Sequence, residues 1–112
     1  MAVPSDRVVI EDLLPNPAGS DKQLEEVTIR NDSGTAIVLT GWTLVDRSGR
    51  TWDLTAEGTL APGQSLRIVR NGRRMSLNNS GDDISLVDSG SATRDNYSYT
   101  SSSEDVRITT GH

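Results

Sequence analysis

The side chains that could carry acid–base chemistry in this sequence are carboxylates, and they occur as adjacent pairs. Within a β-strand, adjacent residues point to opposite faces, so such a pair does not bring two carboxyl groups to one substrate bond. We interpret the pairs as solvated strand ends rather than as catalytic dyads. They are Glu11-Asp12, Glu25-Glu26, Asp82-Asp83 and Glu104-Asp105.

Nucleophilic catalysis lacks a positioned base. The chain has one histidine, the last residue His112, and no cysteine. A terminal imidazole is not held within hydrogen-bond reach of a serine, and without cysteine there are no Cys-His pairs or thiolate metal sites. We therefore predict that the chain is not an enzyme and that it has no catalytic residues, no cofactor and no metal centre.

One loop offers a possible cation site, because it is rich in oxygen ligands. Residues 78–83 read Asn-Asn-Ser-Gly-Asp-Asp, and calcium prefers such oxygens. The loop lacks the spacing of a calcium-binding loop and its bidentate glutamate, and the same residue types are those that a tight turn needs. We interpret the segment as a turn, with calcium binding as the alternative.

The local positive patch of this acidic chain is a cluster of four arginines. The net charge is −5, which repels nucleic-acid phosphates as a whole. A nucleic-acid site would also interleave aromatic residues with the arginines, and none lie nearby. The cluster either pairs with the chain's own acids or binds a partner's carboxylates, a phosphate or an acidic polymer. It consists of Arg67, Arg70, Arg73 and Arg74.

The elements that must position these side chains are strands. Apolar residues alternate with polar ones, and turn-forming residues recur about every ten positions, a rhythm typical of an all-β sandwich or barrel. Alternation places six residues on inward faces: Val27 and Ile29, Leu66 and Ile68, and Ile84 and Leu86. The expected strands are 7–11, 24–31, 36–39, 42–46, 50–54, 65–70, 83–87 and 94–99, with a possible edge strand around Val106 and Ile108.

The register of one hairpin, residues 41–54, can be predicted. A three-residue loop, 47–49, pairs Leu44 with Trp52 and places the two tryptophans of the chain on one apolar face. Such a loop needs a left-handed last residue, which Gly49 supplies. The tryptophans are therefore expected in the core rather than on a ligand platform, with Asp46 and Arg50 as an ion pair at the loop mouth.

The length fits one domain, residues 1–112, with an ordered core of about 7–100 and a polar tail or edge strand at 101–112. No apolar run is long enough for a membrane span or a signal-peptide core, so we expect no membrane insertion. Three Asn-x-Ser sequences match the glycosylation pattern, at about the yield that chance gives in so serine-rich a chain. They begin at Asn31, Asn78 and Asn96.

Five segments together resemble the bacterial form of the lamin-tail domain. They are VIEDLLPNPAGSD (9–21), EEVTIRN (25–31), LTGWTLVDRSGRTWDL (39–54), LAPGQSLRIVRNG (60–72) and SLNNSGDDISLVD (76–88). The resemblance implies an immunoglobulin-like antiparallel β-sandwich, in agreement with the strand pattern. The chain departs from the usual family residues at Glu11-Asp12, Glu26 and Thr28.

The resemblance also implies a kind of function. Lamin-tail domains are non-catalytic modules, attached in bacteria to exported or surface proteins and found in animals as the tails of nuclear lamins. We therefore expect a monomeric or weakly self-associating interaction module of an exported or surface-associated bacterial protein, which binds a protein or a surface polymer and lies outside the cytoplasm. The alternatives are a self-associating structural scaffold and, against the acidic charge, a weak nucleic-acid-binding module.

Overall fold

The computed structural model describes residues 8–14, 25–69, 81–100 and 107–111. No helix in these ranges is long and apolar enough to cross a membrane. The elements are β1 (Val8–Leu14), β2 (Glu26–Asn31), β3 (Ile37–Val38), β4 (Thr43–Val45), β5 (Thr51–Asp53), the short 3₁₀ turn η1 (Thr55–Glu57), β6 (Thr59–Leu60), β7 (Ser65–Val69), β8 (Asp82–Val87), β9 (Thr93–Tyr99) and β10 (Ile108–Thr109).

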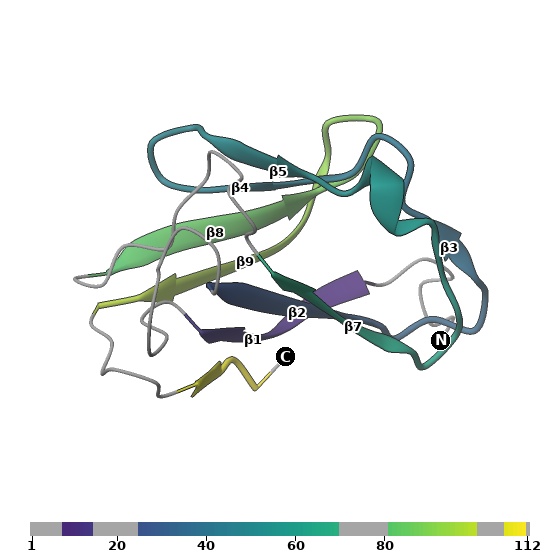
Figure 1. Cartoon of the computed structure of the whole chain (residues 1–112), viewed down its shortest axis with the longest axis horizontal. Coiled ribbons are helices and arrows are strands. Elements are labelled where there is room, and N and C mark those ends of the chain that lie inside the picture. The colour runs from purple at the N-terminus through teal and green to yellow at the C-terminus, as the bar shows by residue number, and fades with distance from the viewer. Residues whose placement is uncertain (1–7, 15–24, 70–80, 101–106, 112) are drawn as a thin grey trace, which may run out of the picture.

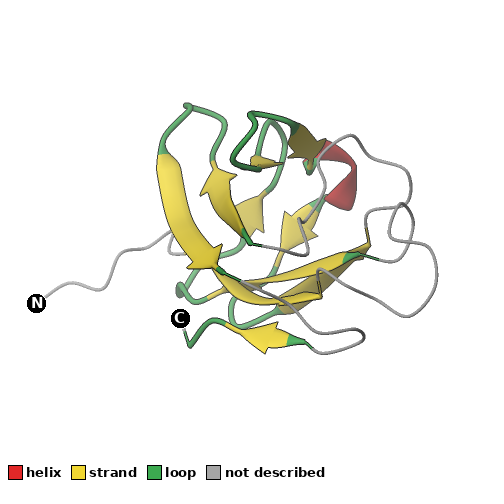
Figure 2. Ribbon diagram, turned by 90° about the vertical axis from the view of Figure 1, so that its left-hand side faces the viewer, coloured by secondary structure: helices red, strands yellow, loops and turns green. Residues whose placement is uncertain are grey.

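Two antiparallel sheets face each other across one core (Figure 1). The first has the order β10-β1-β2-β7, the second the order β5-β4-β8-β9, and β3 pairs with β6 in a small ribbon. Figure 2 shows the layers from the side, with β10 beside the marked C-terminus. This arrangement is an immunoglobulin-like β-sandwich, as the sequence predicted.

Alternation decides which side chains form the core. Of the six inward residues predicted from the sequence, five are buried, namely Val27, Ile29, Ile68, Ile84 and Leu86. Leu66 is only partly buried, although it packs against the core. They pack with Trp42, Trp52 and other apolar residues of both sheets in one cluster. At about 25 cal/mol per Å² of apolar surface removed from water, a large core of this kind is the main stabilising contribution to the fold. The absence of disulfides is therefore no obstacle to its stability.

The hairpin of β4 and β5 has the predicted register. Leu44 lies opposite Trp52, and Gly49 adopts φ +89° at the end of the loop. Trp52 is fully buried, so the expectation of a core role is confirmed. The expected ion pair is wrong. The buried Asp46 carboxylate instead accepts hydrogen bonds from the Arg50 backbone N–H at 3.0 Å and from the Ser48 hydroxyl at 2.7 Å, which cap the tight loop.

Strand β1 differs most from the sequence-based expectation. It was expected to end at Glu11, but it continues to Leu14 through a register shift between Ile10 and Asp12. A bulge adds one residue and restores alternation beyond it, so Leu13 returns to the core. The pairing of β6 with β3 was not predicted, because two-residue strands carry no visible alternation.

Asn31 is a buried polar centre that joins two loops. Its side-chain N–H groups donate to the carbonyls of Thr35 at 2.7 Å and Leu60 at 2.9 Å. Its side-chain oxygen accepts from the backbone N–H of Ser33 at 3.0 Å and from the Ser33 hydroxyl at 2.6 Å. The side chain is fully buried, so this Asn-x-Ser sequence is not an accessible glycosylation site in the folded protein. Asn96, by contrast, is exposed.

Candidate interaction surface

The outward side chains of the first sheet form a charged face. In the register of β1, β2 and β7, Asp12, Thr28 and Arg67 lie side by side, and Val9, Arg30 and Ser65 form a neighbouring row. Residues opposite one another across strands share a face of the sheet. We call this surface the charged face and define it by Glu11, Asp12, Glu26, Arg30, Arg67 and Arg107.

Glu26 is the acceptor that joins two arginines on the charged face. Arg107 donates to the Glu26 carboxylate at 2.6 Å and to Asp12 at 2.8 Å. The Nε of Arg67 lies 3.3 Å from the same Glu26 carboxylate. Burial opposes the charge of the Arg107 guanidinium, but its hydrogen bonds to Glu26 and Asp12 outweigh burial and raise its pKa. Hydrogen bonds from Arg107 therefore connect the segment before β10 with β1 and β2, and an ion pair extends the contact to Arg67 on β7.

A second ion-pair group lies farther along the same face. Arg30 donates to the Glu11 carboxylate at 2.8 Å, and its Nε lies 3.6 Å from the Asp32 carboxylate. The Ser65 hydroxyl donates to the same Glu11 oxygen at 3.2 Å. Glu11 is the extra residue of the β1 bulge, which turns its side chain toward β2 and β7.

Between these groups, Thr28 has a buried hydroxyl. Thr28 is 5 % exposed, and its Oγ1 has no hydrogen-bond partner among the described residues. An unpaired buried hydroxyl costs about 1–3 kcal/mol in proteins. The Thr28 hydroxyl therefore does not stabilise the centre of the charged face by hydrogen bonding to a described residue.

Of the four arginines predicted as a partner-binding cluster, the structure describes Arg67. Its side chain is 58 % exposed, although it pairs with Glu26. Arg67 therefore pairs internally, as one of the two alternatives expects, while more than half of its side chain stays exposed. Arg70, Arg73 and Arg74 lie outside the described residues.

The oxygen-rich loop is described at Gly81, Asp82 and Asp83. Asp82 begins β8, and its Oδ1 accepts from the backbone N–H of Asp83 at 2.8 Å and, across 35 positions, from that of Arg47 at 3.0 Å. Asp83 accepts from the Ser98 hydroxyl, and the Nε of Arg47 lies 3.5 Å from the other Asp83 oxygen. Residues 78–80 lie outside the described ranges. Within those ranges, no group of three or more His, Asp or Glu side chains is placed to hold a metal ion.

Tyr99 lies at this end of the sandwich and is nearly buried. Burial raises the pKa of its phenol, and the negative charges of Asp82 and Glu25 act in the same direction. The phenol therefore stays protonated throughout the neutral range. Tyr99 packs in the core and is not a proton donor or acceptor near neutral pH.

A turn on the second sheet holds an ion pair that sequence reasoning missed. The Nε of Arg94 donates to Asp88 at 2.6 Å, and its guanidinium carbon lies 5.5 Å from the centre of the Trp42 ring. The hydrogen bond from Arg94, with that from the Ala92 N–H, holds the pKa of Asp88 below its ordinary value. The available signal was the turn-forming sequence Asp88-Ser89-Gly90, which does not indicate an arginine partner six positions away.

Comparison with protein families identifies the sandwich. The model of the lamin tail domain matches residues 2–101. The chain belongs to the lamin tail domain family. The expected resemblance is therefore confirmed, and with it the immunoglobulin-like fold. The lamin tail domain is a non-enzymatic domain family. Among curated proteins, none matches the chain significantly.

Part of the charged face lies outside the matched segment. Strand β10, with Arg107 before it, lies beyond residue 101, where the matched segment ends. Sequence reasoning treated this part as a polar tail or an edge strand and did not single out Arg107. The available signal was an arginine directly before an Ile-Thr pair, but its partners Asp12 and Glu26 are far away in the sequence.

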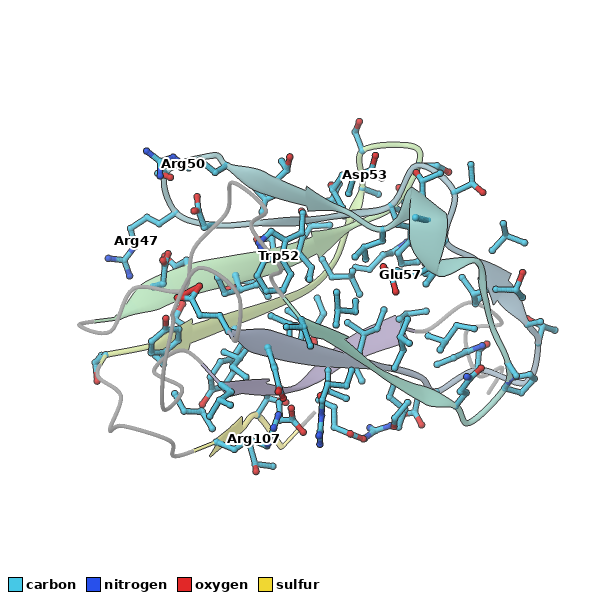
Figure 3. All side chains as sticks on the ribbon, in the orientation of Figure 1. Arg47, Arg50, Trp52, Asp53, Glu57 and Arg107 are labelled. Atoms are coloured by element: carbon cyan, nitrogen blue, oxygen red, sulfur yellow. The ribbon has the colours of Figure 1, made fainter. Side chains whose placement is uncertain are left out.

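Figure 3 separates the arginines spatially. Arg107 lies along the β10 side of the first sheet, whereas Arg47 and Arg50 lie at the tip of the β4–β5 hairpin. The guanidinium of Arg50 forms no ion pair with a described residue, in contrast to Arg47, Arg67 and Arg107. Arg50 is therefore a suitable reference for the effect of a charge change that breaks no such contact.

Proposed function

We propose that this lamin tail domain is an interaction module of an exported or surface-associated bacterial protein. In this proposal it binds a partner protein or a surface polymer without catalysis. The observation that carries the proposal is the match to a non-enzymatic domain family over residues 2–101. A module of this kind contributes binding, and its exposed polar surfaces are where a partner contacts it.

The arginine cluster predicted from the sequence is the part of the protein whose charge favours contact with a partner. Arg67 lies in the middle of β7, and more than half of its side chain is exposed beside Glu26. In the sequence, Arg70, Arg73 and Arg74 follow closely. Guanidinium groups bind carboxylates and phosphates with two parallel hydrogen bonds, so the matching partner presents an acidic surface.

The experiment measures retention of the protein on two immobilised anionic polymers, poly-L-glutamate and polyphosphate. The variant is Arg67→Glu combined with Arg73→Glu and Arg74→Glu, and the matched control is Arg50→Glu. Because each reversed arginine replaces attraction with repulsion, we expect the triple variant to lose retention at least about tenfold. The control should bind like the wild type. Equal retention of the triple variant and the wild type would exclude this surface as the contact.

The two rival functions give different results. A self-associating scaffold shows light scattering that rises with protein concentration, without any polymer. A nucleic-acid-binding module shifts duplex DNA at low salt and loses that binding steeply as salt is raised. At a net charge of −5, we expect no DNA shift.

A further inference from the structure

The outer edge of β1 is covered by a very short strand. In the first sheet, β10 lies outside β1, and the two strands pair only at Asp12 with Thr109 and at Leu13 with Ile108. A sheet edge presents unpaired N–H and C=O groups that accept another strand. Strand β10 also lies beyond the residues that match the lamin tail domain.

The β1 bulge divides this edge into two parts. On one side of the bulge, the backbone N–H of Ile10 donates to the Asp95 carboxylate of β9 at 2.7 Å, so a side chain of the other sheet occupies the edge. At and beyond the bulge, the acceptors belong to Ile10, Glu11 and the paired residues that follow. The part of the β1 edge that can pair with an added strand is thus short and begins at the bulge.

Residues 107–111, which we call the clasp, occupy this part through a specific pattern. Arg107 donates to Asp12 and Glu26 at 2.8 and 2.6 Å. The Thr110 hydroxyl donates to the carbonyl of Ile10 at 2.6 Å or to that of Glu11 at 3.0 Å, and its N–H donates to the Glu11 carbonyl at 3.1 Å.

Apolar packing adds a third contact. Ile108 is partly buried and packs against the core, whereas Thr109 is exposed. A strand at this position therefore needs a basic residue where Arg107 stands, an apolar residue at Ile108 and a hydroxyl at Thr110. At Thr109 the side chain is exposed, so many residue types fit there. Backbone pairing gives affinity to an added strand, and alternate side chains give its specificity.

We propose that the β1 edge is a docking site for an extended peptide strand of a partner protein. The clasp is its intramolecular occupant, which a partner strand of the same pattern displaces. This inference rests on the proposed function in that it names the class of partner, an extended protein segment with a basic residue opposite Asp12 and Glu26. It concerns the outer edge of β1, whereas Arg67 lies on β7; the two sites share the Glu26 carboxylate.

The charges explain why the guest strand is basic. When the clasp leaves, Glu26 retains Arg67 at 3.3 Å, while Asp12 and Glu26 both lose the hydrogen bonds of Arg107. A partly buried carboxylate without its charged donor is unfavourable, so a guest with a neutral or acidic residue at this position binds more weakly.

The experiment opens the clasp in the full chain by combining Arg107→Glu with Thr110→Val. The matched control combines Arg50→Glu with Thr59→Val, which makes the same changes of residue type at exposed positions outside the clasp. The probe is a fluorescent peptide with the sequence of residues 104–112, EDVRITTGH. A second peptide with the arginine replaced by glutamate tests the charge requirement. Binding is followed by fluorescence anisotropy, and near-ultraviolet circular dichroism of the buried tryptophans checks the fold.

We expect the opened variant to bind the peptide at least about 100-fold more tightly than the wild type. The tethered clasp competes at an effective concentration on the order of millimolar. The control should bind the peptide as weakly as the wild type does. The glutamate peptide should bind neither the opened variant nor the wild type. In the wild type with free peptide absent, the Thr110 amide should exchange with solvent at least about tenfold more slowly than the corresponding amide of the opened variant.

Three results would overturn the inference. The first is a folded, opened variant that does not bind the peptide, and the second is equal binding of the glutamate peptide. The third is a dimer of the opened variant that excludes the peptide, which would identify a second copy as the occupant. None of these results changes the outcome of the polymer assay of the arginine cluster, so each proposal can be refuted without the other.

If the double substitution unfolds the chain, a protease site placed within residues 101–106 replaces it. Cleavage after folding frees the clasp without changing any of its side chains. The same peptide then competes with the released segment, and size-exclusion chromatography shows whether the segment dissociates. Failure of the cleaved segment to exchange with added peptide would contradict the docking site.

Discussion

Replacing Asn31 with leucine removes four hydrogen bonds from one buried point. The asparagine side chain donates to the carbonyls of Thr35 and Leu60 and accepts twice from Ser33, at distances of 2.6–3.0 Å. Leucine has a similar size, so the substitution leaves no large cavity. What changes is the hydrogen bonding of the groups that faced the amide.

The magnitude follows from which of those groups remain buried. Thr35 is exposed, so its carbonyl can turn to water, whereas Leu60 and Ser33 are buried. A buried polar group left without a partner costs about 1–3 kcal/mol. Two such sites together should lower the free energy of unfolding by about 3 kcal/mol. At roughly 4 °C per kcal/mol for a domain of this size, Tm should fall by about 12 °C.

The assay is urea and thermal unfolding of Asn31→Leu, followed by tryptophan fluorescence. Asn96→Leu is the matched control, because Asn96 begins an Asn-x-Ser sequence of the same kind but is exposed. The control should change the free energy of unfolding by less than about 1 kcal/mol. If both variants lose the same stability, or if Asn31→Leu loses less than about 1 kcal/mol, the buried hydrogen bonds do not stabilise the fold as argued.

Three further predictions concern the core, a glycine and a carboxylate. Trp52→Ala should lower the free energy of unfolding by about 3–5 kcal/mol in urea titrations, because the indole is fully buried. Gly81→Ala should reduce Tm by several degrees and Gly34→Ala should not: Gly81 has φ +120° and an added Cβ would lie 2.8 Å from a backbone carbonyl, whereas Gly34 has free space. The Arg94 hydrogen bond lowers the folded-state pKa of Asp88. Its contribution to stability is therefore present above the unfolded pKa, about 3.9, and is lost as pH falls through the lower folded pKa. Asp88→Asn should accordingly flatten this acid limb of a stability-versus-pH curve, and an unchanged limb would contradict the assignment.

The hairpin shows how much of the fold was predictable. Its register depends on one loop length, one glycine and the requirement that Leu44, Trp52 and their neighbours share a face. All of these conditions act within fourteen residues, 41–54. The same holds for the alternation in β2, β7 and β8, where each strand reveals its buried face by itself.

The β1 bulge and the buried role of Asn31 were not predictable from local patterns. Glu11-Asp12 read as the solvated end of a strand, yet the chain continues in the sheet because the bulge restores the inward direction of Leu13. Asn31 was expected at the end of a strand and within a glycosylation pattern, although its partners include Leu60, which is 29 positions away.

The sequence by itself determined the fold class, the family, the core faces and the hairpin register, because each follows from the order of neighbouring residues. The tertiary structure alone decided how the edge of β1 is covered. Asp95 reaches Ile10 across 85 positions, Arg107 reaches Asp12 across 95, and Thr110 reaches Ile10 across 100. A hydrogen-bond partner at such separation is set by where the two sheets and the C-terminal strand come together, and folding must bring those segments close before their charges and backbone groups can pair.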